Sequence, residues 1–212
     1  MSKEYGYIGK EVTQDFFNNK GIFNPKDIYE LDLENKWSTF GQLEHIETVN
    51  ASGVSSFDFS DLKDYKIHFM TVNDCTNNSA SKGVAFRLYE AGVLESSSVY
   101  DTMRQFTDTS GTFSENRSSS NSAIRFSSNT NIGSLARNNI NGYLYFFNLL
   151  DSSKYSFTIQ HSSAYSNSDR GEFIFGSNLL PQKSHVNKIQ VLAFDVGTIT
   201  GSFSLYGIRT NS

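Results

Sequence analysis

Histidines and neighbouring carboxylates are the residues of this chain whose types could support catalysis or metal binding. The histidines lie far apart in the sequence, and no two of them have the spacing of metal ligands: His45, His68, His161 and His185. His68 lies within the alternating run "KIHFM", where a satisfied or solvent-facing histidine is the expected role. The histidine pattern therefore predicts no metal site.

The carboxylates also fail to form a pattern typical of an active site. Glu44 and Glu47 are three residues apart in a strand-like run, which places them on opposite faces of a strand. Asp101 and Asp108 are isolated among polar turn residues, and no nucleophile elbow, phosphate loop, dinucleotide fingerprint or calcium loop occurs. We therefore predict no catalytic residue, no cofactor and no enzymatic activity. A sugar-active enzyme stays open as an alternative, because glycosidase carboxylates can lie far apart in sequence.

Charge and cysteine content narrow the class of protein. The 212 residues carry a formal net charge of −4, and lysines and arginines are scattered singly, which argues against a nucleic-acid partner. The N-terminal residues lack the apolar core of a signal peptide, and no apolar run reaches membrane-spanning length. We therefore expect folding in a cytoplasm and no membrane insertion. A single cysteine, Cys75, allows no internal disulfide and is expected to be a buried thiol.

The composition is typical of strands joined by polar turns. Aromatic residues make up 14% of the chain and charged residues 19%, with 18 Phe, 11 Tyr and only 2 Pro. From residue 42 the apolar residues recur with a period of two in about eleven strand-sized runs. These runs, with turn signals between them and no helical segments, predict an all-β domain over residues 42–212. We expect an antiparallel β-sandwich or jelly roll.

Two strand-like runs indicate which side chains form the core. In "KYSFTIQH" the apolar residues alternate with polar ones, and in "GSFSLYGIRT" the last strand of the chain does the same. We expect Phe157, Ile159, Phe203 and Leu205 to be buried, with the last strand in the middle of a sheet. In the polar section 107–141 only "AIRF" has the pattern of a strand.

The segment before the strands contains the signals of one short helix. Asn24 is a good N-cap, Pro25 suits the first helical position and Asp27 complements the helix N-terminus. These residues predict a helix over about 25–35 within a linker that extends to residue 41. Its apolar face would include Ile28 and Leu31, together with Trp37.

Residues 1–24 carry large apolar side chains with neither a strand nor a helix period. They are Tyr5, Tyr7, Ile8, Phe16, Phe17, Ile22 and Phe23. Because apolar groups in an irregular arm need a surface to cover them, we predict that this extended arm binds a partner protein. The alternative is that the arm lies against its own domain.

The run "YLYFF" is apolar on both faces and predicts an oligomer interface. A strand of this kind must be covered on both sides, so Tyr143, Tyr145 and Phe147 are candidates for contact with another subunit. A well-filled core is the alternative explanation. Stacking of exposed aromatic rings on sugars is a further one, although the one tryptophan, Trp37, lies outside the strands.

Several segments in order along the chain resemble virion structural proteins of tailed bacteriophages that infect marine bacteria, including cyanobacteria. They are "GYIG", "IYEL" with "NKW", "GQLEHIETV", "YKIHFMTVND", "NGYLYFFNLLDSSKYSFTIQH" and "GSFSLYGIR". The resemblance covers most of residues 5–208 and is poor over 107–141, which we expect to vary as an exposed loop does. It carries over no catalytic residue.

The resemblance implies a fibre-like or decoration component located in the virion and made in the host cytoplasm. The expected partners are other virion proteins, either of the capsid or of a tail adaptor, and further copies of the chain, with a trimer expected by analogy with phage fibres. The alternative function is a tip domain that binds a host receptor or a host surface glycan.

Overall fold

The structure of this chain is a computed structural model. It describes residues 43–79, 83–127, 138–166 and 169–209, together with residues 4–5, 8–9, 26, 29 and 33. The chain divides into two units, residues 1–42 and residues 43–212. The second unit contains the two large sheets.

Residues 43–209 form an antiparallel β-sandwich, which confirms the predicted fold class. Every strand pairing in the two large sheets is antiparallel. The strands are β3 (Leu43–Val54), β4 (Ser56–Phe59), β5 (Ile67–Asn77), β6 (Val84–Glu90), β7 (Val93–Leu94), β8 (Tyr100–Asp108), β9 (Phe113–Asn121), β10 (Ile124–Arg125), β11 (Ile140–Phe147), β12 (Ser156–Tyr165), β13 (Gly171–Leu180), β14 (Val186–Ala193) and β15 (Ile199–Ile208).

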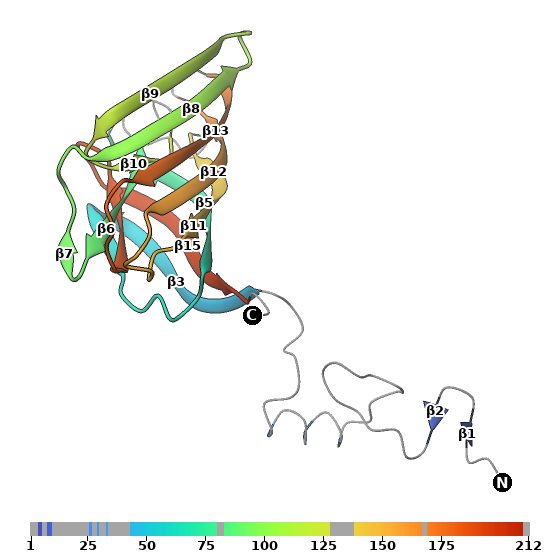
Figure 1. Cartoon of the computed structure of the whole chain (residues 1–212). Helices are drawn as coiled ribbons and strands as arrows, with labels where there is room; N and C mark the ends of the chain where they lie inside the picture. The colour runs from blue at the N-terminus through green and yellow to red at the C-terminus, as the bar shows by residue number, and fades with distance from the viewer. Residues whose placement is uncertain are drawn as a thin grey trace. The chain divides into compact units, whose positions relative to one another are not determined.

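The two sheets differ in size. The larger has eight strands in the order β3-β15-β5-β11-β12-β13-β8-β9. The smaller has five, in the order β10-β6-β14-β4 with β7 paired to β6. Figure 1 shows the strands of the larger sheet side by side, with β8 and β9 at one edge and β3 at the other.

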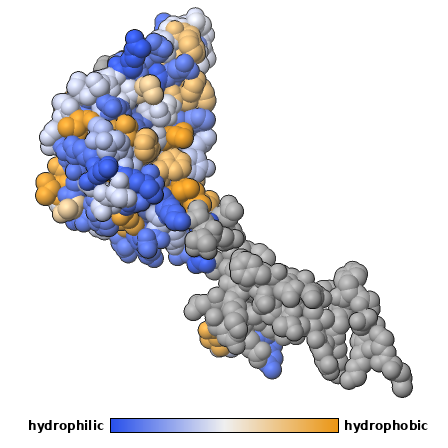
Figure 2. Space-filling view, viewed as in Figure 1, coloured by the Kyte–Doolittle hydropathy of each residue, from blue (hydrophilic) through white to orange (hydrophobic). Residues whose placement is uncertain are grey.

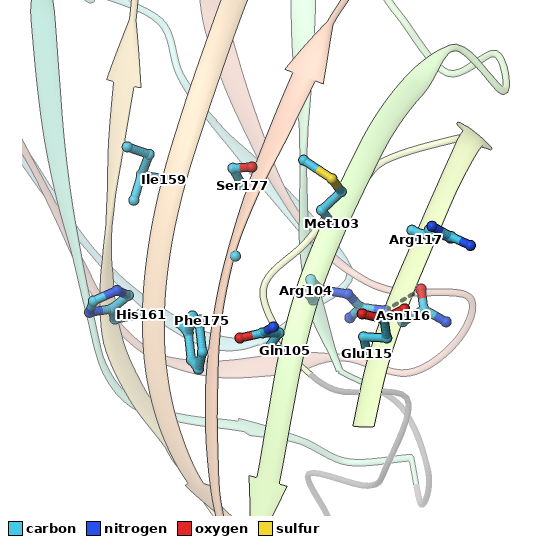
Figure 3. Close-up of a pocket in the computed structure, with 11 residues that line it drawn as sticks. Met103, Arg104, Gln105, Glu115, Asn116, Arg117, Ile159, His161, Phe175 and Ser177 are labelled. Atoms are coloured by element: carbon cyan, nitrogen blue, oxygen red, sulfur yellow. Dashed lines mark hydrogen bonds between the residues drawn. The ribbon is translucent and has the colours of Figure 1, made fainter. Parts of the chain in front are cut away.

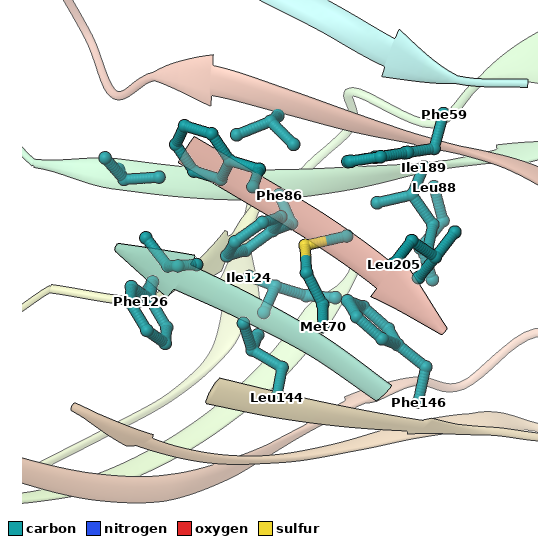
Figure 4. Packing of buried hydrophobic residues seen from close by; sticks show 14 of the residues in the cluster. Phe59, Met70, Phe86, Leu88, Ile124, Phe126, Leu144, Phe146, Ile189 and Leu205 are labelled. Carbon is teal, nitrogen blue, oxygen red and sulfur yellow. The ribbon is translucent and has the colours of Figure 1, made fainter. Parts of the chain in front are cut away.

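The core lies between the sheets and combines side chains from both. From the larger sheet it includes Met70, Leu144 and Phe146, and from the smaller sheet Phe86 and Ile189, all 0% exposed. The rings of Phe86 and Phe146 meet edge to face across the interface at 6.2 Å between centroids. Figure 4 shows these side chains converging between the ribbons. This apolar interface contains the main hydrophobic cluster of the fold.

The last strand lies inside the larger sheet, as the sequence predicts. β15 pairs with β3 on one side and β5 on the other, and Phe203 and Leu205 are 0% exposed. Both pairings shift register beside Gly201, where a Cβ atom would lie 2.8 Å from the Cα of Cys75. Glycine at this bulge allows the two backbones to approach closely.

The prediction that Phe157 and Ile159 are buried is wrong. Phe157 is 43% exposed and Ile159 is 47% exposed, whereas Ser156, Thr158 and Gln160 on the opposite face of β12 are buried. The alternation in "KYSFTIQH" separates the two faces correctly, but the polar face points inward. The physical reason is that Thr158 and Gln160 have hydrogen-bond partners on that side of the strand.

The expectation that 107–141 is a polar loop with one strand is also wrong in part. β8 continues to Asp108, and β9 covers Phe113–Asn121, a run dominated by Ser, Asn and charged residues. Cross-strand hydrogen bonding to β8 makes this segment a strand despite its polar composition. The predicted strand "AIRF" is β10.

In the first unit, β1 (Glu4–Tyr5) pairs antiparallel with β2 (Ile8–Gly9). Lys26, Tyr29 and Leu33 have helical backbone conformation within the predicted helix at 25–35. The other positions of that helix, with Trp37, lie outside the described residues.

Candidate functional site

The outer face of the larger sheet carries an unusual concentration of aromatic side chains. Successive residues of a strand point to opposite faces, so the register of the strands identifies which residues point away from the core. We call the following set the aromatic face: His45, Phe69, Tyr143, Tyr145, Phe147, Phe157, Ile159, His161, Phe173, Phe175 and Tyr206.

Ring contacts connect the aromatic face across six neighbouring strands. Phe69 is 4.9 Å from Tyr145 and 6.1 Å from Tyr206, measured between ring centroids, and Tyr206 is 5.5 Å from His45. On the other side of Phe69 the contacts continue from Tyr143 to His161 at 5.3 Å, and from His161 to the two phenylalanines of β13 at 6.1 and 6.2 Å. The rings restrain one another, which gives the surface a defined shape.

A hydrogen bond fixes the centre of this surface. The hydroxyl of Tyr143 and Nδ1 of His161 are 2.8 Å apart, so one of the two groups donates to the other. Because the bond joins directly opposed residues of β11 and β12, it orients both rings along the sheet.

On the four central strands, β5, β11, β12 and β13, none of the side chains that form this outer face is an acid, a lysine or an arginine. Those residues are Ile67, Phe69 and Thr71 on β5, Tyr143, Tyr145 and Phe147 on β11, Phe157, Ile159 and His161 on β12, and Phe173, Phe175, Ser177 and Leu179 on β13. Aromatic enrichment with depletion of charged residues is typical of the buried centre of protein–protein interfaces.

The inner face beneath β12, β13 and β8 is polar and hydrogen-bonded. Gln160 donates to the carbonyl of Arg125 at 2.7 Å, and Ser162 donates to the carbonyl of Phe126 at 3.2 Å. Asn178 donates to the hydroxyl of Thr158 at 2.9 Å. These bonds satisfy Thr158, Gln160 and Ser162, whose burial would otherwise be penalised, and they explain why β12 can point these residues inward. Ser156 Oγ and Asn178 Oδ1 are buried without a hydrogen-bond partner among the described residues.

Arg104 on β8 belongs to this buried polar layer. Its guanidinium donates to the carbonyl of Ser127 and to Asn116 Oδ1 at 3.4 Å. Burial lowers the pKa of Arg104 to about 10, and the nearby positive charge of Arg125 contributes in the same direction. The side chain therefore stays protonated at neutral pH and anchors residues 125–127 over the inner face.

A groove adjoins the aromatic face where β13 and β12 meet the β8–β9 hairpin. One part has a volume of about 440 Å³ and is lined by Phe175, His161, Gln105, Glu115 and Arg117, among others. A second part of about 570 Å³ continues along the hairpin and includes Met103, Ser177 and Leu179. Figure 3 shows the side chains of the first part coming from four adjacent strands.

The groove combines apolar and polar walls. Rings and aliphatic groups from β12 and β13 face amide, carboxylate and guanidinium groups from β8 and β9. Figure 2 likewise shows hydrophobic residues interspersed with hydrophilic ones over the visible face of the sandwich. Such a lining can hold a ligand that has both apolar surfaces and hydrogen-bonding groups.

The structure brings together the residues predicted for an oligomer interface. Tyr143, Tyr145 and Phe147 all lie on the aromatic face, and none of them is fully buried. The sequence did not identify the contribution of Phe69, His161 and Phe175. Their alternation with buried neighbours was visible in the sequence, but which side faces outward was not.

The residues predicted for the attachment arm are mostly outside the described part of the chain. Tyr5 and Ile8 are opposed in the pairing of β1 with β2. Tyr7, Phe16, Phe17, Ile22 and Phe23 lie outside the described residues.

Within the described residues, no group of three or more His, Cys, Asp or Glu side chains could hold a metal ion. Cys75 is fully buried, and burial raises the pKa of its thiol. The described part of the chain contains no helix with the length and apolar composition needed to cross a membrane.

Neither the models of known protein families nor the curated protein sequences contain a match to this chain.

Proposed function

We propose that this chain is a non-enzymatic structural protein of a bacteriophage particle, and that its β-sandwich assembles with further copies through the aromatic face. The proposed assembly rests on one observation: β12 has its apolar side chains on the outer face and its polar side chains on the inner face. This strand exposes Phe157 and Ile159 and buries Ser156, Thr158 and Gln160.

An outer sheet face of apolar side chains is unfavourable if that face stays exposed to water. The hydrophobic effect favours the removal of such apolar side chains from solvent, by roughly 25 cal/mol for each Å² of apolar area. Every further copy presents the same uncharged aromatic surface, so the faces of copies arranged around a common axis can cover one another without burying an unpaired charge. A trimer is the predicted order of assembly, by analogy with phage fibres, since closed cyclic symmetry satisfies every copy equally.

The place in a virion rests on the sequence resemblance to phage structural proteins. The fold is compatible with that role, because β-sandwiches serve many structural functions, but fold alone does not specify function. The capsid and a tail adaptor are the two candidate partners. Counting copies per purified particle by quantitative mass spectrometry distinguishes them, since capsid decoration follows the capsid lattice and a tail component follows tail symmetry.

A charge placed on the aromatic face tests the proposed assembly. Ile159→Glu puts a carboxylate at a half-exposed position in the middle of β12, and Val93→Glu is its control at a 72% exposed position on β7 of the other sheet. We expect Ile159→Glu to lower the mass measured by light scattering and Val93→Glu to leave it unchanged. A wild-type chain that is monomeric at all concentrations contradicts the proposal.

The N-terminal arm is the proposed attachment element. Because β1 and β2 fold back on one another, residues 10–24 set the reach of the arm, which is at most about 50 Å at roughly 3.3–3.6 Å per residue and enough to cross part of a neighbouring protein. Deletion of residues 2–23 should leave a folded protein that no longer joins particles lacking it. Normal incorporation of the truncated chain shows instead that the arm is not the anchor.

The groove favours a second candidate function, binding of a host surface glycan. Sugars offer apolar ring faces to Phe175 and hydroxyl groups to Gln105, Glu115 and Arg117, which all line the same hollow. A glycan array with the full chain tests this, with Gln105→Ala and Arg117→Ala expected to remove a binding signal. Lys183→Ala, at an exposed position between β13 and β14, is the control. Absence of any signal for the wild type excludes this second function.

A further inference from the structure

β9 is an edge strand with a long open side. It covers Phe113–Asn121, and among the described strands it pairs only with β8. Seven of its nine positions are exposed. Figure 1 shows the β8–β9 hairpin along the border of the larger sheet.

The hydrogen bonding of the hairpin shows which backbone groups of β9 point away from β8. The amide of Asp108 donates to the carbonyl of Thr112 at 3.1 Å, which begins the ladder. In antiparallel pairs, hydrogen-bonded and non-hydrogen-bonded positions alternate, so Ser114 and Asn116 bond to β8. The N–H and C=O groups of Phe113, Glu115 and Arg117 therefore point outward.

Between Phe113 and Ser118 the β9 edge carries few of the features that usually protect an edge strand. Natural edge strands are commonly blocked by proline, by bulges or by charged side chains, above all lysine. β9 contains neither proline nor lysine, and the irregularity in its pairing with β8 lies beyond Ser118. It carries one acid and one base, Glu115 and Arg117, two positions apart and therefore on the same face. At the opposite edge, β3 carries Glu44 and Glu47 but no lysine or arginine.

We infer that the β9 edge binds the β9 edge of a second copy of this chain, antiparallel and centred on a two-fold axis at Asn116. In this register Glu115 of each copy stands opposite Arg117 of the other. The N–H and C=O groups of Glu115 in one copy then exchange hydrogen bonds with those of Arg117 in the other. The dimer gains two cross-strand ion pairs in total.

The charges of Glu115 and Arg117 favour this register over the alternative registers of the β9–β9 pairing. Two β9 strands can form hydrogen bonds only where the outward-pointing N–H and C=O groups of one strand face those of the other. Alternative pairings of the two strands must therefore place Phe113, Glu115 and Arg117 opposite outward-pointing residues of the other copy. A two-fold axis at Glu115 opposes two carboxylates, and one at Arg117 opposes two guanidinium groups. Like charges directly opposite are unfavourable, so the pairing centred on Asn116 is the one that the sequence favours.

This contact uses the edge of the sheet and is separate from the aromatic face. It joins two eight-stranded sheets edge to edge, whereas the assembly proposed above covers their outer faces. The two contacts can therefore be tested independently, and Ile159→Glu leaves every group of the β9 edge in place.

Complementary charge reversal in the full chain is the first test. Glu115→Lys alone places an ammonium group opposite the guanidinium of Arg117, and Arg117→Glu alone places two carboxylates opposite one another, so each variant should show half the wild-type mass in light scattering. An equal mixture of the two restores both ion pairs between unlike copies and should recover the wild-type mass. Single variants that keep the wild-type mass, or a mixture that stays at half, overturn the inference.

A site-specific crosslink tests the position of the two-fold axis. Non-hydrogen-bonded antiparallel partners have Cα atoms about 4.5 Å apart, within the range of a disulfide. Asn116→Cys should therefore give covalent dimers under mild oxidation. In the same register Ser118 faces Ser114 of the other copy, so Ser118→Cys places its two thiols about 13 Å apart along the strand and should not crosslink. The native Cys75 is fully buried and does not interfere. Equal crosslinking of both variants, or of neither, overturns this register.

Discussion

At the scale of single residues, Phe157 and Phe203 are the same side chain in opposite environments. Phe203 is 0% exposed, and its ring meets that of Phe57 at 5.1 Å between centroids. Phe157 is 43% exposed on the outer face of β12. Their energetic contributions to the folded chain should differ accordingly.

Replacement of these two rings by alanine measures that difference. Phe203→Ala removes a core ring and leaves a cavity, so it should lower the free energy of unfolding by about 3–5 kcal/mol. Phe157→Ala should lower it by less than about 1 kcal/mol, because the ring is already partly in water. Chemical denaturation of both variants checks the prediction, and equal losses contradict the assigned faces.

His68 is a buried histidine whose environment favours its neutral form. It is 0% exposed, and its Nε2 donates to the carbonyl of Leu62 at 2.6 Å. Nδ1 is buried and has no hydrogen-bond partner among the described residues. Burial lowers the pKa of His68, although its hydrogen bonds to backbone groups act in the opposite direction.

This lowered pKa predicts a loss of stability in mild acid. Below the ordinary histidine pKa of about 6.5 the unfolded chain takes up a proton that the folded chain does not, so the free energy of unfolding falls as the pH falls. The slope from one such group is at most about 1.4 kcal/mol per pH unit. His68→Gln keeps a donor for Leu62 and removes the titration. Its free energy of unfolding should fall less than that of the wild type between pH 7 and pH 5, and an equal fall contradicts this role.

At the scale of elements, the close packing of β11 against β12 depends on Gly142. This residue faces inward opposite Ser162, and a Cβ atom there would lie 2.7 Å from the Cα of Ser162 and in contact with the carbonyl oxygen of His161. Both obstacles are backbone atoms, so a side chain at 142 must displace β12. That strand positions Ile159 and His161 on the aromatic face.

Gly142→Ala should therefore lower the free energy of unfolding by about 1–3 kcal/mol, the usual range for overpacking. Gly171→Ala is the matched control in a strand, because the nearest atom there is a methyl group of Thr109 at 3.1 Å, which can move. We expect the control to change stability by about 0.5 kcal/mol or less. Thermal or urea unfolding of the two variants distinguishes backbone contact from a general effect of removing glycine.

At the scale of the whole molecule, the core of the sandwich is contained in the second unit. Among the residues that the structure describes, every buried hydrophobic residue of the main cluster lies between Ala51 and Leu205. Because the packing that stabilises the fold comes from these residues, a chain reduced to residues 43–212 should fold by itself. Its unfolding midpoint should lie within a few degrees of the full chain, since a shift of 1 kcal/mol corresponds to roughly 2–4 °C for a domain of this size. Failure of this truncated chain to fold assigns a structural role to residues 1–42.

Local sequence patterns were enough to predict the fold class and much of the strand content. The period of two, the scarcity of proline and the aromatic and β-branched runs are local properties, and they predicted an antiparallel β-sandwich with β15 inside a sheet. The same local alternation separated the two faces of β12 correctly. The polar strand β9 escaped prediction because its residues favour turns, and only its pairing with β8 holds it extended.

Which face of each strand points inward depends on how the strands pack together, and no local pattern in the sequence specifies it. Alternation shows that Phe157 and Thr158 lie on opposite faces, but only the groups opposite them decide which face is buried. Hydrogen bonds to Arg125 and Phe126 make a polar inner surface stable beneath β12, and the rings on its other side then join those of five more strands. The aromatic face and the groove are built from residues distant in the sequence, so they exist only once strand order and register are set.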